Sequence, residues 1–111
     1  MADNRKYYYL KLKENFFDSD SIVLLEDMKD GILYSNILLK LYLKSLKNGG
    51  RLQLDEHIPY TAQMIATLTR HQIGTVERAL AIFQQLGLVE QLDCGLLYMT
   101  DIELMIGQSS V

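Results

Sequence analysis

The chain has 111 residues, the length of a single domain, and 49% of them are apolar, which is enough for a hydrophobic core and excludes general disorder. Its formal net charge of −3 argues against strong binding to nucleic acid irrespective of sequence. No apolar run resembles a secretory signal or a membrane span. The single cysteine excludes an internal disulfide, and we therefore expect a cytoplasmic protein with no membrane partner.

The N-terminal segment has the pattern of a strand. Between Lys6 and Leu12 the residues at even positions, Tyr8, Leu10 and Leu12, alternate with Tyr7, Tyr9 and Lys11. A repeat of two residues is typical of β structure. The alternation would place Tyr8 and Leu10 on one face. It would place Tyr7 and Tyr9 on the other face, so both faces carry large apolar side chains.

Two helices are predicted next, over residues 20–28 and 34–48. Short acidic and hydroxyl side chains just before residue 22 can cap the first helix, and Asp30-Gly31 ends it. Gly49-Gly50 ends the second helix. This second helix is apolar over most of its circumference, which is typical of a helix buried between other elements. Part of its surface could instead face a second subunit.

Between residues 58 and 100 the periodicity changes from helical to alternating at Gly87. Thr61 can cap a first helix and Thr75 a second helix, with a polar turn between them. Gly87 is predicted to be a left-handed C-cap of the second helix. Two short alternating runs then flank Asp93-Cys94-Gly95, a set of residues that favours a hairpin turn.

These elements predict an α+β fold, mainly α with a small β-sheet. The specific prediction is a winged helix-turn-helix with an N-terminal strand-helix extension over residues 1–30. The expected order is helix 34–48, strand 51–54, helix 61–69, helix 75–86, strand 88–92 and strand 96–100, with residues 51–54 closing a three-stranded sheet. The alternative is a small α+β domain whose helix pair only fills a core.

One domain is expected over residues 1–106, and residues 101–106 are expected to start another helix. Residues 107–111 are interpreted as the start of a linker to an absent C-terminal region.

Five blocks of the sequence resemble one protein family. They are KYYYLKLKENFFDSDSI at residues 6–22, YSNILLKLYLKSLKNGGRL at 34–52, IPYTAQMIATLTRH at 58–71, VERALAIFQQLGLVE at 76–90, and the terminal MTDIELMIG. The chain resembles the N-terminal region of phage replisome organiser proteins, found in phages and prophages of Gram-positive bacteria, and is similar in layout to the DnaD-like primosome proteins. The resemblance implies binding to double-stranded DNA at a replication origin, self-association as a homo-oligomer, and work in the cytoplasm of a bacterial host cell. It also implies recruitment of a helicase or helicase loader, through the absent C-terminal region.

The sequence contains no catalytic pattern. It has no G-x-G-x-x-G, no P-loop and no H-E-x-x-H. The acidic residues between positions 18 and 30 are expected to cap helices and to form a solvated face rather than to bind metal. We therefore expect a protein that is not an enzyme and that needs no cofactor and no metal.

The predicted turn and second helix supply the candidate DNA contacts, which are Arg70, His71, Gln72, Thr75, Arg78 and Gln85. Arg78 is the prime candidate for reading a base, because a guanidinium matches guanine with two hydrogen bonds. The alternative for Arg78 is a surface arginine paired with Glu77 or a nearby aspartate. Gln72 and Thr75 suit hydrogen bonds to phosphate or bases near a helix N-terminus.

Charge is segregated along the chain, so a basic face can exist on an acidic protein. Residues 1–13 carry +3, residues 14–30 carry −5 and residues 31–51 carry +4. The basic side chains of the last block are possible contacts to flanking phosphates, or only keep the helix soluble. They are Lys40, Lys44, Lys47 and Arg51.

A second class of function also fits. The fold could serve self-association as a protein-interaction scaffold of the primosome, with little direct binding to DNA. The possible self-association residues are Tyr7, Tyr9, Leu39 and Leu43. The alternative is that residues 14–30 fold back and cover these side chains. The breadth of the apolar face on helix 34–48 and the acidic predicted wing support the scaffold hypothesis.

Overall fold

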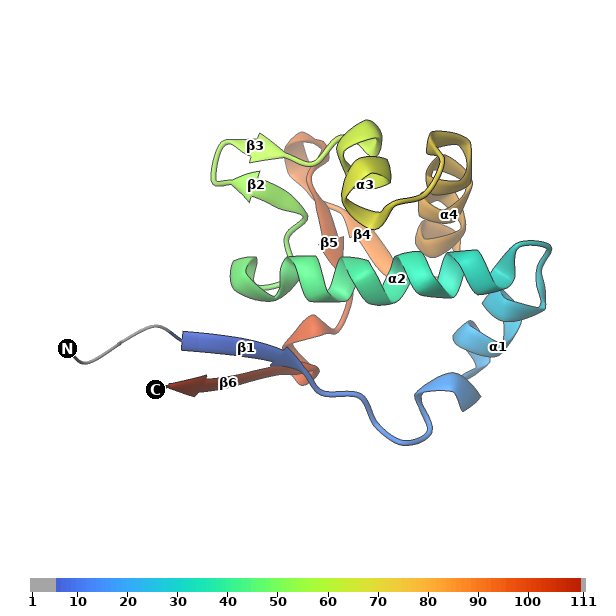
Figure 1. Cartoon of the computed structure of the whole chain (residues 1–111), viewed down its shortest axis with the longest axis horizontal. Coiled ribbons are helices and arrows are strands. Elements are labelled where there is room, and N and C mark those ends of the chain that lie inside the picture. Colours follow the sequence, from blue (N-terminus) through green and yellow to red (C-terminus); the bar gives the residue numbers. More distant parts are fainter. Residues whose placement is uncertain (1–5, 111) are drawn as a thin grey trace.

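The fold is arranged around one long central helix. The computed structural model describes residues 6–110, and its central element is α2 (Gly31–Ser45), extended by a 3-10 turn at Leu46–Asn48. On one side of α2 lie α3 and α4, and on the other side lie β1 and β6 (Figure 1). The short helix α1 (Asp20–Asp27) packs against one end of α2. The structure is an α+β fold, as expected.

The first two helices match their prediction closely. Helix α1 covers nearly all of the predicted range 20–28, and α2 begins three residues before the predicted start at residue 34. The core faces of α2 include Ile37, Leu38 and Leu41, each at most 1% exposed. The prediction that this helix is buried between other elements is confirmed.

The next two helices form a helical pair joined by a short turn. They are α3 (Ala62–Thr69) and α4 (Ile73–Gln85), and the Thr61 hydroxyl accepts a hydrogen bond from the backbone N–H of Met64 at 3.1 Å. The predicted cap at Thr61 is therefore confirmed. The predicted cap at Thr75 is wrong, because α4 already begins at Ile73 and Gln72 is its N-cap residue.

Gly87 ends α4 as predicted. Its φ is +74°, the left-handed region that glycine adopts at low cost. Its N–H donates to the carbonyl of Gln84 (3.1 Å), and the N–H of Leu88 donates to that of Phe83 (2.8 Å). This pair of bonds is a Schellman motif, which satisfies two free carbonyls at the end of the helix.

A hairpin follows α4, also as predicted. Strands β4 (Val89–Gln91) and β5 (Leu97–Met99) pair antiparallel, with Val89 opposite Met99. The chain reverses at Asp93–Gly95, where Cys94 has a φ of +65°. The turn prediction is thus confirmed, and α3, α4 and this hairpin follow in the expected order.

The segment after α2 only partly matches the predicted strand 51–54. Arg51 forms a bridge with Tyr98, and the N–H of Leu52 donates to the carbonyl of Leu97 (2.9 Å), so this segment begins alongside β5. It then turns away, and β2 (Gln53–Asp55) pairs with β3 (Ile58–Pro59) in a small separate hairpin. Pro59 has no N–H to donate, which a short edge strand tolerates.

The end of the chain differs from its prediction. The expected helix over residues 101–106 is a single 3-10 turn, Ile102–Leu104. Residues 107–110, interpreted as the start of a linker, belong to β6 (Ile106–Ser110), which pairs antiparallel with β1 (Lys6–Leu10). Residue 111 lies outside the described part of the chain. The ends of that part thus form one two-stranded ribbon, here called the β1–β6 ribbon, and the expected domain limits remain a prediction.

A single hydrophobic core joins these elements. Its fully buried members come from every helix and from the β4–β5 hairpin, and include Ile22, Leu25, Leu52, Ile65, Val76, Phe83, Val89, Met99 and Ile102. Tyr8 and Leu10 of the ribbon pack against this core from below α2, as their predicted face requires. No helix between residues 6 and 110 is long and apolar enough to cross a membrane.

Candidate nucleic-acid interface

The turn between α3 and α4 is short and tightly bonded. Arg70 adopts the left-handed conformation (φ +63°), and its N–H donates to the carbonyl of Ala66. The N–H of His71 donates to the same carbonyl at 3.1 Å. Gln72 is extended and leads directly into α4. Two helices joined by three residues have the layout of a helix-turn-helix.

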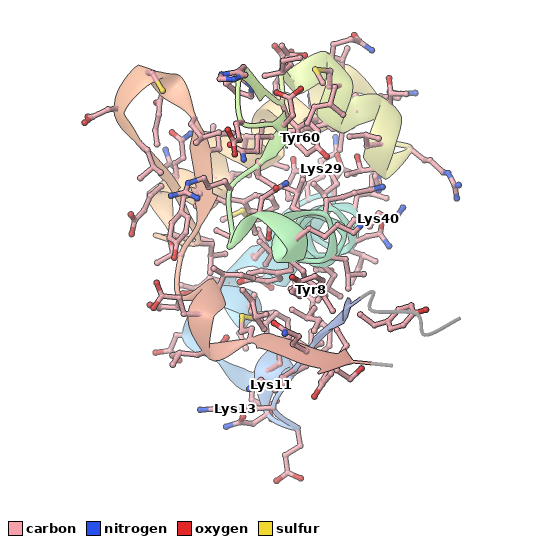
Figure 2. The ribbon with its side chains drawn as sticks, turned by 90° about the vertical axis from the view of Figure 1, so that its left-hand side faces the viewer. Tyr8, Lys11, Lys13, Lys29, Lys40 and Tyr60 are labelled. Atoms are coloured by element: carbon pink, nitrogen blue, oxygen red, sulfur yellow. The ribbon has the colours of Figure 1, made fainter. Side chains whose placement is uncertain are left out.

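Two side chains of α2 hold this turn. The Lys40 ammonium donates to the carbonyl of Thr69 at 2.7 Å, and the Nε2–H of His71 donates to Oδ1 of Asn36 at 2.8 Å. A cation at the last carbonyls of a helix is favoured by the helix dipole, so Lys40 also caps α3. Lys40 (labelled in Figure 2) was a candidate phosphate contact, but the structure gives it a positioning role within the protein.

His71 is a weak candidate for a cationic contact. Partial burial, and secondarily the charge of Lys40, lowers the pKa of His71 from its ordinary value of 6.5. The imidazole is therefore neutral at pH 7, and its Nε2–H is used by Asn36. Arg70 is exposed at the same turn, and it is the residue there that carries a positive charge to the surface.

The outer face of α4 is mixed, with two charged, two polar and two apolar residues. Its exposed residues are Ile73, Glu77, Arg78, Ala81, Gln84 and Gln85. The Arg78 Nε–H donates to the hydroxyl of Tyr34 at 3.4 Å, and Nη2 donates to the hydroxyl of Thr75 at 3.5 Å. These weak bonds tilt the Arg78 side chain toward α2, and the side chain stays exposed. Gln85 lies at the surface, as predicted.

Thr75 does not lie where the sequence analysis placed it. As a candidate DNA contact it was expected to be exposed, but only 7% of it is exposed. The reason is its position one turn before Ala79, which is fully buried and on the same face. That four-residue spacing was the signal that could have revealed it. Thr75 is a hydrogen-bond partner of Arg78 rather than a surface residue.

The predicted basic stripe is divided among three places. Lys40 supports the turn between α3 and α4. Lys44 and Lys47 line an open hollow of about 330 Å3 at the C-terminal end of α2, here called the basic hollow, together with Leu43, Asn48, Gln53, Leu54 and Tyr60. Arg51 is exposed beside Tyr98 of the hairpin. The structure therefore does not bring these four side chains together with the turn.

The β4–β5 hairpin is acidic rather than basic. Glu90 and Asp93 are exposed on it. Burial raises the pKa of Tyr98 above its ordinary value of 10.0, and Glu103, Glu90 and Asp101 add to that shift. The negative field that this implies disfavours contact with phosphates at the hairpin.

The possible self-association residues do not lie together on one surface either. Tyr7 and Tyr9 are 46% and 50% exposed on β1, and Leu43 is 54% exposed in the basic hollow, across α2 from that strand. Leu39 is half-buried against the core. The alternative that residues 14–30 cover these side chains is wrong for the three exposed ones.

The sequence did not predict one feature of the surface, an apolar hollow. An apolar hollow of about 240 Å3 lies between α3 and the β2–β3 hairpin, lined by Leu54, Gln63, Met64, Thr67 and Leu68. Leu54 borders both this hollow and the basic hollow, so the two are neighbours. It was missed because the sequence does not reveal the β2–β3 hairpin, which exposes Leu54. Between residues 6 and 110 no group of three His, Cys, Asp or Glu side chains could hold a metal ion.

Comparison with known proteins gives one match. No curated protein and no solved structure matches the chain significantly. The family model described as N-terminal phage replisome organiser matches residues 9–111. Because that match covers essentially the whole chain, the chain belongs to the N-terminal phage replisome organiser family, and its role lies in the initiation of phage replication.

Proposed function

We propose that this chain is a binding module, not an enzyme, that recognises double-stranded DNA at a phage replication origin through a winged helix. The observation that carries the proposal is the α3–turn–α4 pair, whose second helix keeps one whole face free of packing. The hairpin that follows α4 occupies the position of a wing. The bonds from Lys40 and His71 to their partners fix the turn on α2, so the free helix is presented rigidly.

The charges favour contact through the turn and the first half of α4. Arg70 and Gln72 suit phosphate contacts beside the N-terminus of α4, where backbone N–H groups are free. Arg78 is the base-reading candidate, because its weak bond to Tyr34 can be exchanged for two bonds to guanine. The acidic hairpin contributes little, so we expect a weak dependence of affinity on salt.

A gel-shift or anisotropy titration on origin duplex and on random duplex, at one stated salt concentration, tests the proposal. Arg78→Ala is expected to lose about 1–3 kcal/mol of specific binding and to relax sequence preference at one position. Arg70→Ala is expected to weaken binding to both duplexes alike. Lys29→Ala, an equal loss of charge in the turn before α2, is the matched control and should bind as the wild type does. Equal affinity of the wild type for both duplexes contradicts the proposal.

A second candidate function is a protein-interaction scaffold, and a separate observation favours it. The apolar floor of the basic hollow is bordered by Lys44 and Lys47. The outward face of α1 has the opposite character, with exposed Val23 and Leu24 between exposed acids, Asp20 and Asp27. Charge and apolar surface are therefore complementary between two different parts of the chain. Docking of α1 of one copy into the basic hollow of another would make a homo-oligomer.

Charge exchange tests this candidate by light scattering. Lys44→Glu/Lys47→Glu and Asp20→Lys/Asp27→Lys should each be monomeric alone, because each then repels its own kind at the contact. An equimolar mixture should regain the mass of the wild type, because each variant surface finds an opposite charge. Lys11→Glu/Lys13→Glu is the control with the same change of charge elsewhere. A monomeric wild type, or a mixture that stays monomeric, removes the candidate. Recruitment of a helicase or helicase loader remains a prediction from the family resemblance.

A further inference from the structure

The β1–β6 ribbon carries two large aromatic side chains on its outer face. Tyr8 and Leu10 turn toward the core, whereas Tyr7 and Tyr9 are about half exposed on the other face. Both rings are thus exposed to solvent on a two-stranded ribbon, on the side of α2 away from the helix-turn-helix (Figure 1). Neighbouring rings on one face of a strand lie about 7 Å apart along the chain.

The side chain of Tyr9 extends across the ribbon, from β1 over the neighbouring strand β6. Its cross-strand partner is Gly107, and the Tyr9 ring occupies the space that a side chain on Gly107 would need. Glycine therefore allows the ring to lean over β6 while half of its surface stays open. A ring held in this way presents a π face to anything that approaches the ribbon.

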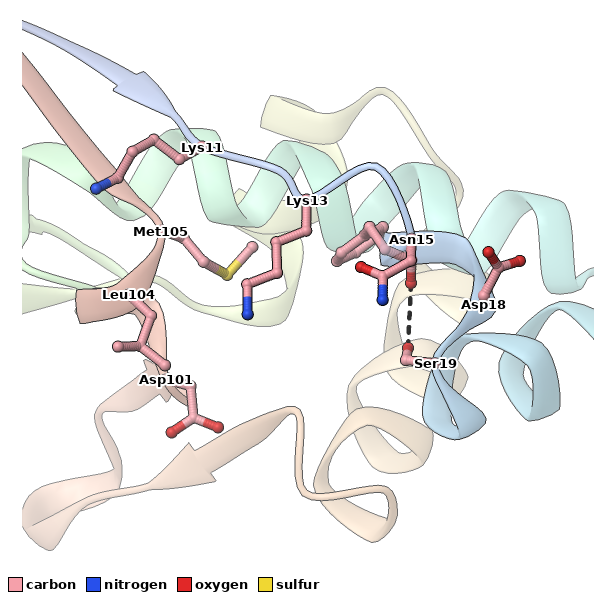
Figure 3. Close-up of a pocket in the computed structure, with 9 residues that line it drawn as sticks. Lys11, Lys13, Asn15, Asp18, Ser19, Asp101, Leu104 and Met105 are labelled. Carbon is pink, nitrogen blue, oxygen red and sulfur yellow. Dashed lines mark hydrogen bonds between the residues drawn. The ribbon is translucent and has the colours of Figure 1, made fainter.

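The ribbon is also locally basic within an acidic protein. Residues 6–13 contain three lysines and no acid, and residues 105–110 contain no charge. The N–H of Lys11 donates to the carbonyl of Met105 (2.7 Å), so the strand alternation continues and places Lys11 on the face of Tyr7 and Tyr9. Lys11 and Lys13 both line an open hollow of about 440 Å3 beyond the end of the ribbon, and the Lys13 ammonium points into it (Figure 3). Asp18 and Asp101 border the same hollow, so the lysines are the cationic part of a mixed site.

We propose that the outer face of the β1–β6 ribbon binds single-stranded DNA, with bases stacked on Tyr7 and Tyr9 and phosphates at Lys11 and Lys13. Stacking on aromatic rings combined with lysines along the backbone is how proteins bind single strands with little sequence preference. An apolar partner would leave the charges of the two lysines unpaired, whereas phosphate groups would pair with them. This site is separate from the helix-turn-helix and goes beyond the proposed binding of duplex DNA.

The test is fluorescence anisotropy of a labelled oligothymidylate of about 15 nucleotides with the whole chain, at low salt of about 50 mM. Tyr7→Leu/Tyr9→Leu should weaken binding by at least about tenfold, because leucine keeps the apolar bulk but has no π face. Tyr7→Phe/Tyr9→Phe keeps both rings and should bind like the wild type. Because circular dichroism of both variants reports folding, a loss in the leucine variant alone is attributable to stacking.

The lysines are tested by the salt dependence of the same titration. Lys11→Gln/Lys13→Gln should lower affinity and make the slope of log K against log salt shallower by about 1.4, near 0.7 for each lost phosphate contact. Lys29→Gln removes one positive charge from the turn before α2 and should leave both affinity and slope unchanged. Arg70→Ala should also bind the single strand like the wild type, so failure of duplex binding is distinguishable from failure of this site.

Three results would overturn the proposal. They are no binding of the single strand by the wild type at low salt, unchanged affinity in the leucine variant, and unchanged slope in the Lys11 and Lys13 variant. Light scattering adds a fourth: a dimer that depends on Tyr7 and Tyr9 and ignores added oligonucleotide would make this face an interface between copies.

Discussion

The two sides of α2 are built on different principles. On one side, α3, α4 and the β4–β5 hairpin follow one another in sequence and join through short turns. On the other side, the ribbon pairs Lys6 with Ser110, which lie at opposite ends of the described chain. Closure of so long a loop has a large entropic cost, which grows only slowly with its length. The first side is specified by local signals, and the second depends on the rest of the fold being in place.

The two sides also differ in how deeply they are buried. Phe83 of α4 is completely buried, whereas the ribbon contributes the half-buried Tyr8 and Leu10 to the core. Buried apolar area is the main source of stability. We therefore expect the helix-turn-helix side to dominate the stability of the fold, and the ribbon to loosen first. A site on the ribbon can adapt to a ligand at small cost, whereas the α3–α4 turn is held rigidly.

The largest expected effect comes from Phe83→Ala. Loss of this fully buried ring leaves a cavity in the hydrophobic core, and should lower the free energy of unfolding by about 3–5 kcal/mol. Because small domains have only about 5–15 kcal/mol in total, the variant should be close to unfolding. Urea denaturation followed by circular dichroism measures the change.

Phe17→Ala is the matched control for that variant. Phe17 is 46% exposed and makes an edge contact with Phe16, with ring centroids 5.1 Å apart. Its loss should cost about 1 kcal/mol. Equal losses in the two variants would contradict the view that stability resides on the helix-turn-helix side.

The features predicted correctly from the sequence are those whose signal and effect lie within a few residues. Thr61 caps the helix that starts at the next residue, and Gly87 ends the helix that precedes it. The turn at Asp93–Gly95 likewise needs only its own backbone preferences. Strand β6 has no such signal, because only its pairing with β1 makes the segment extended.

The candidate site was predictable only in part, for a related reason. Exposure of Gln85 follows from helix periodicity, and exposure of Arg70 follows from its place in a polar turn. The role of Lys40 depends on which carbonyl of another helix comes within reach, and no pattern within α2 contains that information. The separation of Lys44 and Lys47 from the turn depends in the same way on where α3 crosses α2.

Gly107→Ala tests the ribbon. The new methyl group overlaps the Tyr9 ring, which must swing away from β6, and the expected loss of stability is about 1–2 kcal/mol. In a chain that already carries Tyr9→Ala the same substitution should cost little, since the ring is gone. Ser109→Ala, two residues further along β6, is the control and should change stability by less than about 0.5 kcal/mol. Equal cost of Gly107→Ala in both backgrounds would show that the ring does not lie over the glycine.

Thr61→Ala tests a purely local feature of the other side. The hydroxyl of Thr61 satisfies one free N–H of α3, and its loss should cost about 1 kcal/mol. Thr67→Ala on the same helix removes a hydroxyl that bonds only to the carbonyl of Gln63, and should be nearly neutral. The losses from Thr61→Ala and Gly107→Ala should add within about 0.5 kcal/mol, because the two sites share no contact. A large departure from additivity would mean that the two sides of α2 are coupled.

The smallest expected effect is a dependence on pH confined to the helix-turn-helix side. Partial burial, aided by Lys40, lowers the pKa of His71 in the folded state below its ordinary value of 6.5. Between the lowered pKa and 6.5 the unfolded chain binds more protons than the folded chain, so this contribution to stability is complete above 6.5 and is lost as the pH falls through that window.

His71→Gln should remove this part of the pH dependence of unfolding, whereas His57→Gln, in the exposed turn between β2 and β3, should retain it. Hydrogen exchange at acidic pH should show faster opening at the α3–α4 turn and an unchanged ribbon, because protonation of His71 places a partly buried cation beside Lys40 and does not touch β1 or β6. Identical pH profiles for the wild type and His71→Gln would contradict the assignment.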